Sequence, residues 1–256
     1  MGRRTVKSGQ SNWYVGYKKH TIRLWLVHHE PAVLLVPLVS WLTPANVGEN
    51  GLLVPGLKYL WRHWSWYPRF VIGDLGYVSA RHKQYCRRIW DTAVLTHRRG
   101  DQTLVAPFEA ECQVFCHQGQ SLRWLQYDSR AEEHWFGLRE PADICACCWE
   151  ASNCPQEFSY RADAQETLLG RLPLSTRAAQ TLLQRVRPWI EAAQSFEKNQ
   201  LGLSDMFLNS LRFTWCMGLL ADAVCLLRAH ALLGQRCLPK PLLGDLAPQQ
   251  LLIEFQ

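Results

Sequence analysis

Apolar residues along the first part of the chain follow the spacings of short strands and of one helix. Residues 21–42 are rich in Val, Leu and Ile and are interrupted by Pro31 and Pro37. This pattern predicts two short strands joined by a turn at residues 28–31. Over residues 52–64, leucines and a tryptophan recur at three- and four-residue intervals, which predicts a helix with one apolar face.

The next segments continue the alternation of strand and helix. Residues 69–74 form a compact apolar run, residues 79–89 form a basic stretch with helical character, and residues 92–96 form another short apolar run. Strand, helix and strand in this order predict an α/β fold with a mixed sheet.

The character of the chain changes after residue 107. Residues 108–160 contain six of the ten cysteines and show little sustained periodicity, which indicates an inserted subdomain. We therefore expect a core in two parts, residues 1–107 and residues 161–256, interrupted by this Cys-rich insertion.

The last part of the core is predicted to be helical. Helical spacing begins near residue 175 and ends near residue 233, with a break at residues 202–204. Ser175 or Thr176 is the expected N-cap of the first helix, and Pro188 is expected to open the next segment at its first turn.

The composition indicates a net positive charge and a protein of a reducing compartment. The 256 residues are 48% hydrophobic and carry a formal net charge of +6, which suits a polyanionic partner but is common among proteins. The apolar run at residues 207–233 is interrupted by Arg212, Asp222 and Arg228, which favours a buried amphipathic helix over a membrane span. A polar, basic start and many cysteines predict a cytoplasmic protein with free or metal-bound thiols.

Asp74 is the first candidate site residue. It closes a predicted strand and precedes Gly76, which places a carboxylate at the carboxyl end of a sheet strand. Open α/β sheets hold their sites at that edge. The alternative is an Asp that only caps the following turn.

The second candidate is an R-x3-E-x6-K pattern formed by Arg187, Glu191 and Lys198. At about 100° per residue, these three side chains would lie within about 60° of one another on one helical face. A surface salt-bridge array would produce the same pattern. The functional interpretation is a metal-binding Glu between two cations that hold phosphate.

The third candidate is a structural Zn²⁺ site in the insertion. Two groups of thiols separated by a loop can converge tetrahedrally on zinc, and buried free thiols are the alternative. The expected ligands are Cys112, Cys116, Cys145 and Cys148, with His117, Cys147 and Cys154 as substitutes. The remaining cysteines are expected in the core: Cys86, Cys216, Cys225 and Cys237.

Four motifs in order resemble the core of bacterial insertion-sequence DDE transposases. They are G-Y-K-K-H at residues 16–20, T-P-A-N at residues 43–46, D-L-G-Y at residues 74–77 and R-x3-E-x6-K at residues 187–198. The family signature Y-x2-R-x3-E-x6-K has Tyr where this chain has Gln184. The resemblance covers about residues 13–99 and 175–233.

The resemblance implies a ribonuclease H-like core that binds DNA and acts on insertion-sequence ends. Asp74 and Glu191 would bind Mg²⁺ or Mn²⁺ for phosphodiester hydrolysis and strand transfer, and Arg187 and Lys198 would hold DNA phosphates. A homodimer on DNA in the bacterial nucleoid is the expected assembly, with no membrane partner. Some members carry a Cys-bearing insertion at the corresponding place, which agrees with the zinc hypothesis.

Further DNA contacts are expected from Lys18 and from the basic stretch after Asp74, where Arg81 and Lys83 are the leading candidates. A solvated helix face is the alternative. The complete stretch comprises Arg81, His82, Lys83, Arg87, Arg88, Arg98 and Arg99. His20 and His28 are expected to be structural.

The family's first catalytic Asp has no counterpart. Residues 1–73 contain no Asp, and the acids there are Glu30, in a predicted turn, and Glu49, in the stretch after Asn46. We therefore expect a truncated, split or decayed transposase that does not cleave DNA by itself. The rival hypothesis is a non-catalytic, zinc-containing nucleic-acid-binding protein.

Overall fold

The computed structural model describes most of the chain in two compact units. The described residues are 2–5, 11–14, 16–28, 32–77, 79–98, 104, 108, 113–116, 119–138, 154–155, 157–203, 210–235 and 252–255. Unit 1 combines residues 1–77 with residues 185–256, and unit 2 comprises residues 78–184. The second unit is thus inserted in the first, although its limits differ from the 108–160 expected for the insertion.

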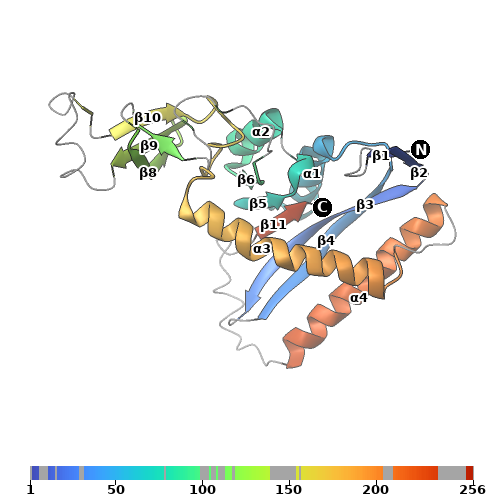
Figure 1. The fold of residues 1–256 in the computed structure, drawn as a ribbon. Helices are drawn as coiled ribbons and strands as arrows, with labels where there is room; N and C mark the ends of the chain where they lie inside the picture. The colour runs from blue at the N-terminus through green and yellow to red at the C-terminus, as the bar shows by residue number, and fades with distance from the viewer. Residues whose placement is uncertain are drawn as a thin grey trace. The chain divides into compact units, whose positions relative to one another are not determined.

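Unit 1 is built on a long antiparallel hairpin that follows the predicted two strands. It consists of β3 (Tyr17–His28) and β4 (Ala32–Pro44), shown in blue in Figure 1. The register shifts between Ile22 and Arg23, opposite the segment of β4 that contains Pro37. Proline is tolerated there because β4 is an edge strand and the irregularity interrupts the ladder.

The hairpin extends into a mixed sheet through two short strands. β5 (Phe70–Gly73) is the predicted apolar strand, and β11 (Leu252–Phe255) comes from the far end of the chain. β11 pairs antiparallel with β3 and parallel with β5, so the order is β4-β3-β11-β5. The structure therefore has the mixed α/β character that was expected, with a strand between β3 and β5 that the sequence pattern did not predict.

Unit 1 also contains a short N-terminal hairpin, and a helix that follows β4. β1 (Gly2–Thr5) and β2 (Ser11–Tyr14) form a hairpin that the sequence did not predict. A 3₁₀ turn, η1 (Glu49–Leu52), leads into α1 (Leu53–Trp64), which confirms the predicted helix. α1 buries its leucines at the predicted spacing: Leu53, Leu57 and Leu60.

Helix α3 (Arg177–Ser195) begins in unit 2 and continues into unit 1. The Thr176 hydroxyl accepts the Ala179 N–H at 3.2 Å, which confirms one of the two predicted caps. Pro188 lies inside α3, so the prediction that it opens a new segment is wrong. A π-helical turn, η4 (Phe196–Gln200), follows directly, and the break comes at Gly202, whose φ is +70°.

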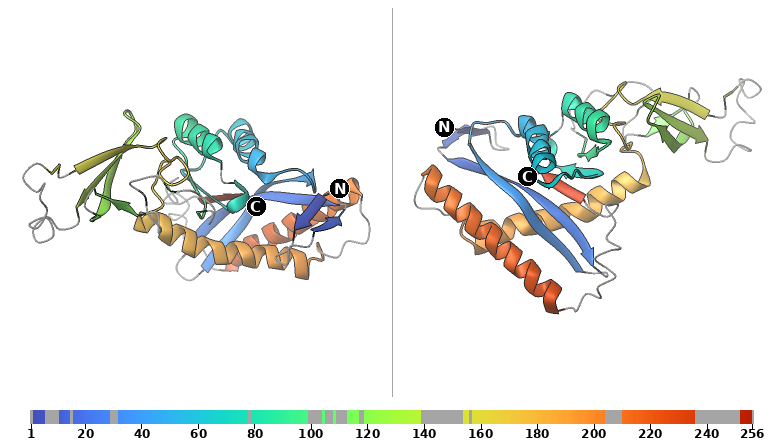
Figure 2. Two further views of the ribbon diagram at one scale, coloured as in Figure 1. Left: turned by 45° about the horizontal axis from the view of Figure 1, so that its top comes forward. Right: turned by 180° about the vertical axis from the view of Figure 1, so that it is seen from behind.

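Helix α4 (Leu211–Gln235) packs across β4 and β3, as the views in Figure 2 show. The prediction of an amphipathic helix with a buried apolar face is wrong. Its buried positions include Thr214, Ala221 and Ala229, whereas Leu220 and Leu227 are 60% and 70% exposed. By length and composition, Leu211–Leu232 is the one helix among the described residues that could cross a membrane, and 28% of its most apolar window is buried.

Unit 2 combines a helix and strand that were predicted with a sheet that was not. α2 (Ala80–Trp90), capped by Ser79, and β6 (Ala93–Leu95) confirm the basic helix and the strand after it. The rest is a four-stranded antiparallel sheet within the supposedly aperiodic segment. Its strands, in the order β10-β9-β8-β7, are β7 (Val114–Phe115), β8 (Ser121–Asp128), β9 (Glu133–Leu138) and β10 (Glu157–Arg161).

Candidate functional site

The first three motifs of the resemblance, separated by up to 61 positions in the sequence, meet in unit 1. The Ala45 N–H donates to the Gly16 carbonyl at 2.9 Å, which joins the first two of them. His20 is buried, with Nε2 2.8 Å from the Thr43 hydroxyl and Nδ1 3.4 Å from the Tyr77 hydroxyl. His20 is therefore structural, as predicted, and it ties the hairpin to the turn after Asp74.

Asp74 lies at the carboxyl end of β5, where the chain enters the 3₁₀ turn η2 (Leu75–Tyr77). Its Oδ1 accepts the Gly76 N–H at 2.7 Å, so the capping role considered from the sequence is present. The residue keeps an exposed side, yet partial desolvation raises the pKa of its carboxyl above the ordinary value. The Gly76 hydrogen bond opposes this rise, and the charge of Glu49 adds to it.

Glu49 is the functional candidate that the sequence argument set aside. It opens η1, and its Oε1 accepts from Lys18 Nζ at 3.2 Å. A Cβ placed on Gly76 would lie 2.2 Å from Glu49 Oε2 and 2.9 Å from Asp74 Oδ1. The two carboxylate oxygens are thus no farther apart than the sum of these distances, and a side chain at position 76 would collide with both.

This pair of carboxylates has the chemistry of a site for a hard divalent cation. Mg²⁺ binds carboxylate oxygens at about 2.0–2.1 Å and usually keeps several waters as its remaining ligands. A cation would reduce the repulsion between the two acids. The positive charge of Lys18 already reduces it in part.

The R-x3-E-x6-K pattern divides at the π-helical turn. Arg187 Nε donates to Glu191 Oε1 at 2.8 Å, and both side chains are about 60% exposed, as in a surface i,i+4 pair. Lys198 lies in η4, where the hydrogen bonds span five residues instead of four. The uniform rotation of about 100° per residue assumed for these three side chains does not hold across that turn.

The π-helical turn instead buries the neighbouring Glu197, which the sequence did not mark as special. Glu197 is 5% exposed and accepts from Lys19 Nζ at 3.1 Å and from Arg23 Nη2. Lys19 Nζ also donates to Asp222 Oδ1 of α4 at 2.7 Å. These four side chains form an ion-pair network that joins β3 to η4 and α4. In the sequence, the signal that could have indicated this network was Lys19, the second lysine of G-Y-K-K-H.

Two of the four Lys and Arg side chains of helix α2 are buried within unit 2. Lys83 is 3% exposed, and its Nζ donates to Thr96 Oγ1 at 2.8 Å and to the Thr167 carbonyl at 3.3 Å. Arg87 is 4% exposed and forms two hydrogen bonds with Glu166, at 3.0 and 2.8 Å. Lys83 is therefore a structural cation, and its placement argues against the predicted DNA contact. Arg81 is exposed, as a DNA contact requires.

The zinc hypothesis falls largely outside the described residues, where Cys112, Cys145 and Cys148 lie. Within the described part of the chain, no group of three metal-ligating side chains is present. Cys116 accepts the Gln120 N–H at 3.3 Å. The zinc site stays a prediction.

The isolated cysteines do not all follow the expectation of core residues. Cys86 is buried, and desolvation raises the pKa of its thiol to about 12, in agreement with the prediction. Cys216 is exposed, so its assignment to the core is wrong, and Cys225 is half-buried. Cys237 lies outside the described residues.

No protein-family model, curated protein or solved structure matches this chain. Any functional assignment therefore depends on the motifs and on the contacts among them.

Proposed function

We propose that this chain is a DDE-type DNA transposase with a ribonuclease H-like core, in which residues 1–73 supply no first catalytic Asp. The observation that carries the proposal is the meeting of three motifs around Asp74. His20 contacts Thr43 and Tyr77, and Gly16 contacts Ala45. The β3–β4 pairing by itself brings the first two motifs together, so the contact that adds support is that of His20 with Tyr77 of the third motif.

The mixed sheet supports the same proposal. An antiparallel hairpin lies beside a parallel pair of strands, and Asp74 follows the last residue of β5. Carboxylates at the ends of sheet strands suit two-ion phosphodiester chemistry, in which divalent ions activate the attacking oxygen and stabilise the leaving one.

The proposed metal ligands are Asp74 and Glu191, together with Glu49 as a nearby acid. A single ion shared by Asp74 and Glu191 stays a prediction. Glu49 is already paired with Lys18, so we expect it to strengthen binding of one ion and not to replace the missing Asp. The chain is therefore expected to bind a divalent cation weakly and DNA by its exposed cations, without cleaving DNA.

Metal binding is tested by titrating Mn²⁺ into the full chain and measuring free ion by electron paramagnetic resonance. Asp74→Asn and Glu49→Gln should each weaken binding by about tenfold, which corresponds to roughly 1.4 kcal/mol. Asp128→Asn is the matched control, because Asp128 Oδ1 also accepts a backbone N–H two residues later, at 2.8 Å. Equal losses in all three variants would reject the site.

Cleavage is tested with DNA from the flanks of the coding sequence, in Mg²⁺ or Mn²⁺. We expect binding that falls steeply with added salt, because phosphate contacts release counterions, and no nicking. Nicking that disappears in Glu191→Gln would show that the missing Asp is dispensable. DNA binding that needs zinc but is unaffected by Asp74→Asn and Glu191→Gln would favour the zinc-containing nucleic-acid-binding protein.

A further inference from the structure

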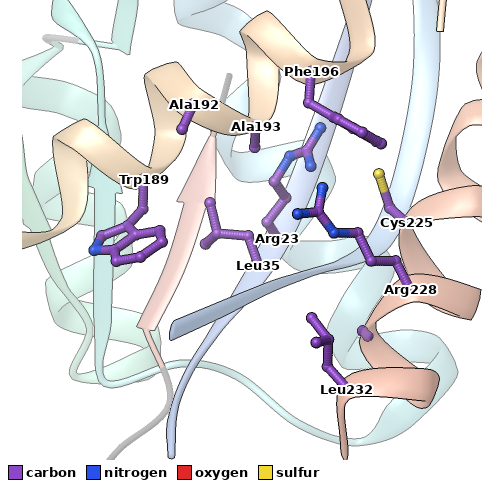
Figure 3. Close-up of a pocket in the computed structure, with 10 residues that line it drawn as sticks. Arg23, Leu35, Trp189, Ala192, Ala193, Phe196, Cys225, Arg228 and Leu232 are labelled. Carbon is purple, nitrogen blue, oxygen red and sulfur yellow. The ribbon is translucent and has the colours of Figure 1, made fainter. Parts of the chain in front are cut away.

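A cavity of about 170 Å³ lies in unit 1 among β3, β4, α3, η4 and α4. Figure 3 shows it between Trp189 and Phe196 on one side and Leu232 on another. Its apolar walls also include Leu35 and the small residues of α3 and α4: Ala192, Ala193 and Ala229. The described residues that line it include two arginines, Arg23 and Arg228, and no carboxylate.

Arg23 is completely buried, and its hydrogen bonding is incomplete. One nitrogen, Nη2, donates to Glu197. Its Nε and Nη1 atoms are buried without a hydrogen-bond partner among the described residues. Buried donors without acceptors are rare in folded proteins, and such donors are available to a bound ligand. The side chain lines the cavity, so an acceptor located there can reach these nitrogens.

Arg228, an exposed residue of α4, supplies a second cation at the same cavity. Its guanidinium carbon lies 4.9 Å from the centre of the Phe196 ring, a cation–π contact that holds the group in place. In the view of Figure 3, the guanidinium groups of Arg23 and Arg228 point toward each other below Phe196. Glu197 already neutralises Arg23, so an anion in this cavity would be held by the unpaired Arg23 nitrogens and by Arg228.

The charge balance indicates a single negative charge. Lys19 and Arg23 are matched by Glu197 and Asp222 in the buried network, and Arg228 adds one positive charge. Desolvation raises the pKa of the Cys225 thiol, which leaves that wall neutral. A phosphate dianion would carry excess charge into an apolar space, whereas a carboxylate balances it and matches the guanidinium geometry.

We propose that this cavity binds a small organic monoanion, with its carboxylate between Arg23 and Arg228 and its apolar or aromatic body against Trp189 and the alanines of α3. This binding site is independent of the proposed transposase activity. It differs from the Asp74 region in the sign of the charge that it accepts.

The test uses benzoate as the probe and the full chain as the protein, with isothermal titration calorimetry as the readout. Benzamide has nearly the same shape without the charge, so we expect it to bind at least about tenfold more weakly. Arg228→Gln should weaken benzoate binding by a similar factor, because it removes one guanidinium and leaves the Arg23–Glu197 pair in place. Ala193→Leu should abolish binding of both compounds by filling the cavity.

Arg212→Gln is the matched control. Arg212, like Arg228, is an exposed arginine of α4, but it does not line the cavity. It should leave benzoate affinity unchanged. Thermal unfolding checks that all variants are folded. Equal affinity for benzoate and benzamide, an equal loss in Arg212→Gln, or no benzoate binding to the folded unmodified chain would each overturn the proposal.

Discussion

Helices α2 and α4 bury side chains of the opposite kind from those that their compositions predict. α2 is basic, yet it buries Lys83 and Arg87 within unit 2. α4 is apolar, yet it leaves Trp215, Leu220 and Leu227 substantially exposed in unit 1. Average composition thus predicted that each helix forms and did not predict which side chains it buries.

The contacts of each helix explain the inversion. The cations of α2 are matched by acceptors from distant segments, including Glu166 and the Thr167 carbonyl, which satisfy buried charge. α4 approaches the hairpin with small residues, and a Cβ on Gly218 would lie 3.6 Å from the Lys19 side chain. Close packing of small residues leaves the large side chains of α4 on the outer surface. The partners of a helix therefore decide its buried face.

The largest effect is expected from breaking the buried pair of α2. Glu166→Ala should lower the free energy of unfolding by about 3–5 kcal/mol, because Arg87 would stay buried with only the partly exposed Glu132, at 3.2 Å, and the Tyr127 hydroxyl as partners. Arg88→Ala removes a solvent-screened pair with Glu132, whose arginine partner is 45% exposed, and should cost far less. Urea denaturation of both variants measures the difference. Similar losses would contradict the internal role of Arg87.

A second effect, on the order of 3 kcal/mol, concerns the pH dependence of unit 2. Burial, with smaller contributions from Arg87 and Arg171, lowers the pKa of His134 from 6.5 to about 4. Its Nε2 donates to the Gly170 carbonyl at 2.9 Å, and its Nδ1 accepts from Trp124 Nε1 at 3.1 Å, which requires the neutral ring.

Between about pH 4 and pH 6.5, His134 is therefore protonated in the unfolded chain and neutral in the folded chain. The stabilisation is complete above pH 6.5 and decreases as the pH falls toward about 4. His134→Gln should flatten the pH dependence of the unfolding free energy in this range. His63→Gln, on the exposed part of α1, serves as the control. An unchanged slope in His134→Gln would reject the assignment.

A smaller loss is expected from the buried polar face of α4. Asp222→Asn should cost about 1–3 kcal/mol, because Lys19 loses one charged partner and keeps Glu197. Chemical denaturation beside Glu166→Ala gives the comparison. A loss as large as that of Glu166→Ala would mean that the two buried networks are equally dependent on single pairs.

The smallest effect is expected on the outer face of α4. Leu227→Gln should change the free energy of unfolding by no more than about 0.5 kcal/mol, because the side chain is 70% exposed and loses little packing. Thermal unfolding at several protein concentrations would detect any contribution from self-association. A loss above about 1 kcal/mol at low concentration would show that this face is covered within one chain.

The sequence by itself determined the elements whose signals are local. The spacing of Leu53, Leu57 and Leu60 predicted α1, and an apolar run followed by D-x-G-Y predicted that Asp74 ends a strand. Such patterns depend on neighbours a few residues away, and the N-cap of α3 at Thr176 is equally local. The mixed α/β class followed from the order of these elements.

Only the tertiary structure decided which distant groups meet. Glu49 lies beside Asp74 because η1 and the turn after β5 pack at Gly76, and no spacing in the sequence encodes that contact. β11 pairs with β3 and β5 across more than 170 positions of the chain, and η4 shifts the helical phase so that Glu197 is buried. Long-range pairing and burial depend on the whole fold, because the acceptors that make a buried charge stable come from segments far away in the sequence.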